Sequence, residues 1–215
     1  MKTSKINGEW TTKELQIDKN WLINLDHLDK QELFKATKFA IKSNKSLYDI
    51  KDSDFPLNNF VNKINLIKKQ IQFGFGFVVI KGLPITEFND EETKVMLWGL
   101  GQYLGYPEKQ DKAGSLLHVV TDTGASFANT DHIRGFQTNE ELQFHTDGAD
   151  IFALLCIRNA KTGGLSKLVS SVAIFREIEQ NRPDLARVLQ QQFHFDSRTQ
   201  NPNDDKIQKI PIFVK

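Results

Sequence analysis

Three histidines in this sequence stand two residues before an aspartate, a spacing that can bring two metal ligands together. The pairs are His27 with Asp29, His145 with Asp147, and His194 with Asp196. Side chains two positions apart on a strand project from the same face. An imidazole nitrogen and a carboxylate oxygen suit Fe(II), and two histidines with one carboxylate leave positions open for a co-substrate and oxygen. The spacing predicts a metal site, and context must choose the pair.

The surroundings favour His145 and Asp147. A predicted strand leads to His145, Gly148 follows Asp147, and a glycine turn at 163–164 then presents Ser166, whose hydroxyl fits an anionic co-substrate. The other two pairs have structural explanations. The first lies at the expected cap of a helix, and the third lies on a half-buried strand between two phenylalanines.

Two other chemistries fit poorly. Gly74 and Gly76 precede a predicted strand instead of following one, and Val79 stands where the third glycine of a dinucleotide fingerprint is needed. Cys156 lies in the apolar run 152–157, where we expect a buried, unreactive thiol.

The composition excludes several kinds of partner. With 28 Lys and Arg against 27 Asp and Glu, the chain lacks the charge excess that holds a phosphate backbone or an anionic membrane. No segment is long and apolar enough to span a bilayer, and a single cysteine permits no internal disulfide. We expect one cytoplasmic domain of 215 residues that binds neither nucleic acid nor membrane.

Hydrophobic periodicity divides the chain into a helical and a β-rich part. Residues 1–110 form a mainly helical flank, with helices at 29–43, 57–73 and 89–104 and one buried core strand at 75–80. Residues 111–215 predict the first part of a barrel or sandwich, with a helical insert at 172–191 that restarts at Pro183. Its strands are expected at 116–121, 142–145, 152–157, 165–170, 192–195 and 207–214.

Several motifs occur in an order that resembles a known family. They lie at residues 76–84, 100–105, 119–124, 134–138, 144–147, 163–166 and 170–174. In this order they resemble the taurine dioxygenase/TfdA-like branch of the Fe(II)- and 2-oxoglutarate-dependent oxygenases. The resemblance implies an α+β fold, with N-terminal helices flanking a double-stranded β-helix, or jelly-roll, core.

The resemblance also implies site residues and an activity. His145 and Asp147 match the first two iron ligands, and Ser166 matches the hydroxyl that contacts the 2-oxoglutarate carboxylate. The implied reaction uses O2 and 2-oxoglutarate to hydroxylate a small organic molecule, and it releases succinate and CO2. Selectivity in this branch lies in loops, so the sequence specifies neither the substrate nor the oligomeric state.

The sequence also departs from the family pattern. The third iron ligand, a downstream histidine, and the arginine that pairs with 2-oxoglutarate are not found, because His194 is too close to the first pair. We therefore expect these 215 residues to be the N-terminal two-thirds of the family chain, without the last part of the barrel and inactive alone. Two alternatives stay open: an inactive, shortened relative acting as a binding module, and a metal-binding barrel completed by His194 or a partner chain.

Overall fold

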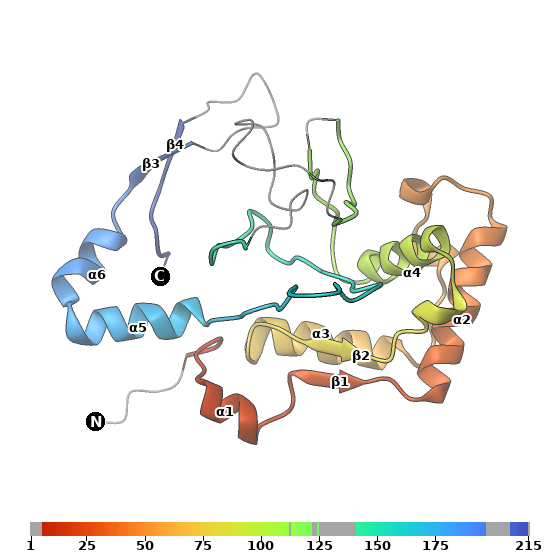
Figure 1. The fold of residues 1–215 in the computed structure, drawn as a ribbon, viewed down its shortest axis with the longest axis horizontal. Helices are drawn as coiled ribbons and strands as arrows, with labels where there is room; N and C mark the ends of the chain where they lie inside the picture. The colour runs from red at the N-terminus through yellow and green to blue at the C-terminus, as the bar shows by residue number, and fades with distance from the viewer. Residues whose placement is uncertain (1–5, 112, 122–123, 125–140, 197–206, 215) are drawn as a thin grey trace. The chain divides into compact units, whose positions relative to one another are not determined.

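The computed structural model describes residues 6–111, 113–121, 124, 141–196 and 207–214 (Figure 1). The chain divides into two compact units, residues 1–106 with 168–215, and residues 107–167. The first unit contains all the helices and strands of the described residues. The α-helices are α1 (Thr12–Ile17), α2 (His27–Lys42), α3 (Val61–Phe73), α4 (Asp90–Gln102), α5 (Ser171–Asn181) and α6 (Pro183–Leu189). The strands are β1 (Leu22–Asn24), β2 (Val79–Lys81), β3 (Phe193–Asp196) and β4 (Ile207–Ile210), and short 3-10 helices span Leu47–Asp49, Asp52–Asp54 and Ile85–Glu87.

Helix α2 begins two residues earlier than its sequence predicts. Its cap is Asp26, not Asp29: the Asp26 side chain accepts from the Asp29 backbone, and the Asp29 side chain accepts from the Asp26 backbone in return. Glu32, three residues after Asp29, accepts hydrogen bonds from the backbone N–H groups of Asn58 and Phe60 just before α3. The prediction failed because three carboxylates stand near the helix start with similar spacing.

The core of the first unit forms around α2, α4 and the 3-10 helices Leu47–Asp49 and Asp52–Asp54, with further buried side chains on α3. Its fully buried side chains include Leu33, Ile50, Phe55, Phe60, Ile64 and Met96. Gly99 of α4 permits a close approach, because a Cβ at this position would lie 2.3 Å from ring atoms of Phe55. Helical periodicity predicted α3 and α4 well, although α3 begins at Val61 and not at residue 57.

The predicted strand at 75–80 is shorter and less buried than expected. Strand β2 pairs in parallel with β1, placing Ile80 opposite Ile23. Ile80 is half-buried, and β1 is the one strand that pairs with β2 among the described residues. Phe75 is buried outside the strand, and the indole N–H of Trp10 donates to its carbonyl over 2.9 Å.

Helix α5 is joined to the N-terminal segment of the same unit. The Ser170 hydroxyl caps α5 by accepting from the Ala173 N–H, and it donates to the Gly8 carbonyl over 2.6 Å. Gly8 has φ +79°, which favours glycine, and its N–H donates to the Gly74 carbonyl. The Pro183 restart is confirmed as the first residue of α6, and β3 and β4 form an antiparallel pair near their predicted positions.

The described residues of the second unit, 107–167, form neither helix nor strand. The strands predicted at 116–121, 142–145, 152–157 and 165–170 are therefore not formed in the part of the chain that is described. These segments are rich in residues that favour strands, but a strand also needs a neighbouring strand that pairs with its backbone N–H and C=O groups. Cys156 is exposed, which corrects the expected burial. Among the described residues the apolar run around it belongs to no sheet.

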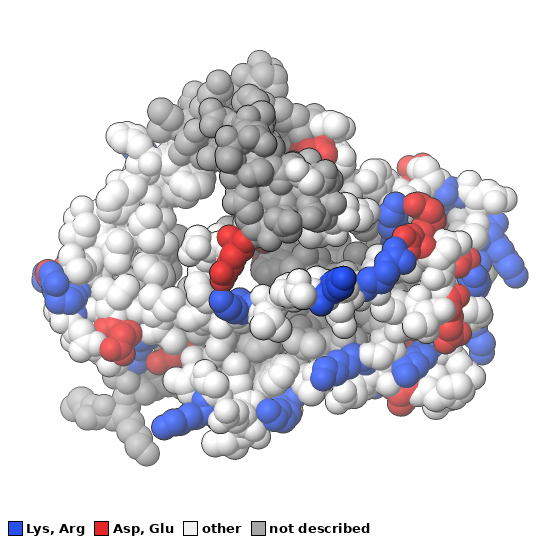
Figure 2. All heavy atoms as spheres, in the orientation of Figure 1, with Lys and Arg blue, Asp and Glu red and all other residues white. Residues whose placement is uncertain are grey.

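Basic and acidic side chains are interspersed over the face of the molecule in Figure 2. Lys38 of α2 pairs with Glu92 of α4, and Lys45 pairs with Asp54 over 2.7 Å.

None of the helices that the structure describes combines the length and the apolar character that crossing a membrane requires.

Candidate metal centre

His145 and Asp147 lie together in a part of the second unit that forms neither helix nor strand. The Nε2 atom of His145 is 4.0 Å from Oδ1 of Asp147, and the two side chains are 56% and 51% exposed. Because the segment forms no strand, strand alternation does not hold the pair together. Their proximity follows from the local chain path through residue 146, and their exposure leaves both groups open to an ion.

The neighbouring backbone orients the imidazole ring. The Nδ1 atom of His145 is 2.8 Å from the carbonyl oxygen of Gln143. A carbonyl only accepts, so Nδ1 donates in this contact; in the neutral ring Nε2 then carries the lone pair, on the side of Asp147. Such hydrogen bonds to the distal ring nitrogen orient histidines that bind metals. No distinctive residue type marked Gln143 in the sequence, because its backbone makes the contact.

The pair lies near, but not at, the separation needed to hold one divalent ion. Donors that each lie about 2 Å from an ion are about 4 Å apart only on opposite sides of it and are closer when they are neighbouring ligands, so the observed distance of 4.0 Å is too long for neighbouring ligands. Small rotations of two exposed side chains would shorten it. Within the described ranges, no third His, Cys, Asp or Glu completes a cluster of three.

Ser166 follows the predicted glycine turn. Gly163 and Gly164 have φ values of +76° and +72°, the left-handed conformation that glycine tolerates. Ser166 is exposed, and the contacts of His145 and Asp147 do not include it. The next residue, Lys167, pairs with Glu141 over 2.8 Å, so the two predicted site segments do meet through these side chains. No local sequence pattern predicts this pair.

The other two His-x-Asp pairs belong to the first unit. His27 is the first residue of α2, and its Nε2 lies 2.8 Å from the Gln31 amide nitrogen. His194 lies on β3 opposite Lys209 of β4. Arg134 and its motif at 134–138 lie outside the described residues.

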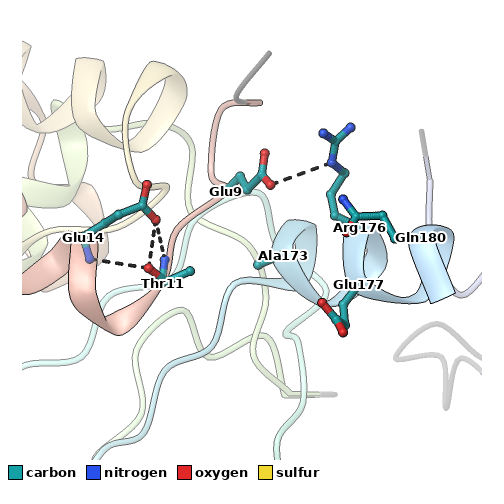
Figure 3. A pocket seen from close by; sticks show the side chains of 7 residues that line it. All are labelled: Glu9, Thr11, Glu14, Ala173, Arg176, Glu177 and Gln180. Carbon is teal, nitrogen blue, oxygen red and sulfur yellow. Dashed lines mark hydrogen bonds and ion pairs between the residues drawn. The ribbon is translucent and has the colours of Figure 1, made fainter. Parts of the chain in front are cut away.

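A pocket of about 450 Å³ lies in the first unit between residues 9–14 and α5 (Figure 3). Its walls are mostly polar: Glu9, Thr11, Glu14, Ala173, Arg176, Glu177 and Gln180. Arg176 Nε is 3.7 Å from Glu9 Oε1, and Glu14 forms a capping box with Thr11. The Arg176 and Glu9 contact joins the N-terminal segment to α5, and none of the predicted site residues lines the pocket.

The model of one protein family, described as taurine catabolism dioxygenase TauD, TfdA family, matches residues 43–214. The chain belongs to the TauD/TfdA family. The predicted resemblance is thereby confirmed, and the mixture of helices and sheet is consistent with the α+β fold of the TauD/TfdA family. Membership supports oxidoreductase chemistry of the dioxygenase kind.

Two curated relatives are similar over most of this chain. The FR-33289 synthase of Streptomyces rubellomurinus is 28% identical over 193 residues, covering 90% of this chain and 57% of the relative. The taurine hydroxylase-like protein SAT17 of Stachybotrys chartarum is 26% identical over 202 residues, covering 90% of this chain and 52% of the relative. The chain thus spans somewhat more than half the length of these two relatives.

Proposed function

We propose that this protein acts in an Fe(II)- and 2-oxoglutarate-dependent dioxygenase reaction that hydroxylates a small organic molecule. The observation that carries the proposal is the His145 and Asp147 pair, with Nε2 and Oδ1 4.0 Å apart and the imidazole oriented by the Gln143 carbonyl. Family membership supports the same chemistry. A jelly-roll core around this pair is part of the proposal.

The residues have distinct roles in this proposal. His145 and Asp147 hold Fe(II), which when bound supplies the chemistry that couples O2 and 2-oxoglutarate to oxidation of the substrate. The Gln143 carbonyl keeps the proton on Nδ1, so that Nε2 is free to bind. Ser166 donates a hydrogen bond to a carboxylate of 2-oxoglutarate, for which its exposed hydroxyl is available.

Fe(II) binding by the Asp147→Ala variant tests the metal assignment. We expect at least about a 100-fold loss of Fe(II) affinity, since removing a ligand should exceed the loss caused by removing its supporting partner. The fold should change little, because Asp147 is half exposed. The measurement is an anaerobic Fe(II) titration, followed by the weak visible charge-transfer band that appears when 2-oxoglutarate chelates the iron.

His27→Ala and His194→Ala are matched controls, because each removes a histidine from another His-x-Asp pair. Both should bind Fe(II) like the parent. Undiminished binding by Asp147→Ala would refute the assignment. A loss in His194→Ala equal to that in His145→Ala would instead support a metal site completed by His194.

A binding module without catalysis is the second candidate function. The observation that favours it is that no cluster of three metal-binding side chains occurs among the residues that the structure describes. The same titration separates the two functions. Fe(II) binding without the 2-oxoglutarate band supports the module, and the band supports the oxygenase.

A further inference from the structure

One ion pair joins the two segments that carry the predicted site residues. Lys167 Nζ donates to Glu141 Oε1 over 2.8 Å, although the residues are 26 positions apart. Glu141 lies four positions before His145, and Lys167 directly follows Ser166. Both residues belong to the second unit, so the contact is internal to it.

No backbone hydrogen bond fixes these segments against each other. Residues 141–147 and 163–167 are all described, and none of the backbone hydrogen bonds joins one range to the other. In a β-sheet the ladder determines which residues lie opposite, and a slip of two residues moves a side chain by roughly 7 Å. Without a ladder, contacts between side chains can set how the two segments lie against each other.

We propose that Glu141 and Lys167 are positioning residues, which set the register of the Ser166 segment against the segment that bears His145 and Asp147. This inference rests on the proposed function, because it concerns the same site. The pair acts on the ligand through the placement of Ser166 and does not touch the ligand itself. Two opposite charges suit this role, because their attraction is strongest in one register and falls as the segments slip.

The electrostatics of the pair support a modest effect. The hydrogen bond from Lys167 lowers the pKa of Glu141, and the same bond raises the pKa of Lys167, so both groups are charged at neutral pH. The side chains are 63% and 72% exposed, which keeps the interaction weak and sensitive to salt. A register preference of up to about fivefold is expected from such a pair. Variants should fold normally, which simplifies the test.

Charge reversal tests the pair directly. The variants are Glu141→Lys, Lys167→Glu and the double reversal, which restores an attractive pair with its charges exchanged. The first readout is amide hydrogen exchange of residues 141–147 and 163–167 in metal-free protein. The second is a titration of 2-oxoglutarate against the Fe(II)-loaded protein under anaerobic conditions.

Each single variant should exchange faster in both segments and bind 2-oxoglutarate roughly three- to fivefold more weakly. The double variant should recover both properties, and 1 M salt should reduce all the differences. The matched control is reversal of Glu91 and Lys94, an ion pair of 2.6 Å on α4, which should leave both readouts at parent values.

Exchange in the single variants equal to that of the parent overturns the proposal, and so does a double variant that recovers neither property. Failure of the proposed function is seen separately. If the parent chain binds no Fe(II) and no 2-oxoglutarate, the oxygenase proposal fails. Exchange in the metal-free protein still decides whether Glu141 and Lys167 hold the two segments in register.

Discussion

The buried core includes large apolar side chains of residues 6–106, whereas the large apolar side chains of residues 107–167 are mostly exposed. In the first region Phe55 is 0% and Phe60 1% exposed, whereas in the second Phe152 is 57% and Leu165 87% exposed. The first region contains helices with buried faces. The described part of the second region contains no helix or strand.

The difference follows from where each kind of element finds its hydrogen bonds. A helix pairs its N–H and C=O groups within one segment, so an amphipathic helix needs only another apolar face against which to pack. A strand needs a second strand for the same groups. Residues 107–167 have the apolar composition of strands, and their described residues have no strand neighbour.

Truncation of one phenylalanine in each region tests this contrast with the largest expected effect. Phe55→Ala should lower the free energy of unfolding by about 3–5 kcal/mol, because it leaves a cavity beside Gly99 in a close-packed core. Phe152→Ala should change it by less than about 0.5 kcal/mol, since its ring is already more than half exposed. Urea denaturation followed by the helical circular dichroism signal measures both.

Equal losses in the two variants would contradict the comparison. They would show that the Phe152 ring is packed as tightly in solution as that of Phe55. An unchanged denaturant midpoint in Phe55→Ala would equally contradict the assignment of the core to α2, α4 and the 3-10 helices Leu47–Asp49 and Asp52–Asp54.

The same contrast explains what the sequence could predict. Helical periodicity identified α2, α3 and α4, and proline placed the start of α6 at Pro183, because these signals are local. The short α1 and β1 were missed, as each is too brief for a periodic signal. His145 and Asp147 were predicted from spacing and context, and the structure brings them together. The Glu141 and Lys167 contact was not predictable, because a pair 26 positions apart depends on the path of the chain between them.

Substitution of Ser166 tests whether residues 107–167 contribute to 2-oxoglutarate binding, whereas residues 6–106 contribute to the stability of the fold. Ser166→Ala should weaken 2-oxoglutarate binding to the Fe(II)-loaded protein by roughly 1.5–3 kcal/mol, the range for a hydrogen bond to a charged group. Fe(II) affinity and unfolding free energy should barely change. Isothermal titration under anaerobic conditions measures the affinity, and Ser171→Ala, which removes another exposed serine hydroxyl, is the control. Equal 2-oxoglutarate affinity in Ser166→Ala and the parent would limit Ser166 to a structural role in the turn.

The smallest expected effect concerns an ion pair inside the packed region, where the register is already fixed by the core. The hydrogen bond from Lys38, followed by that from the Asn89 backbone, lowers the pKa of Glu92 from its ordinary value of 4.5. A carboxyl whose pKa is lower in the folded state stabilises the fold above its unfolded pKa, and this contribution is lost as the pH falls through the folded pKa. The side chains of Lys38 and Glu92 are 36% and 21% exposed, so solvent screens the pair and its contribution should be below about 1 kcal/mol.

Glu92→Gln should therefore lower the unfolding free energy slightly at pH 7, and the difference from the parent should disappear in acid. Denaturation curves between pH 7 and pH 3 measure this, and repeating them in 1 M salt should shrink the difference at pH 7. Parallel pH profiles for the two proteins would show that the Lys38 and Glu92 contact contributes no stability. The packing of α2 against α4 would then depend on buried side chains such as Leu33 and Met96 alone.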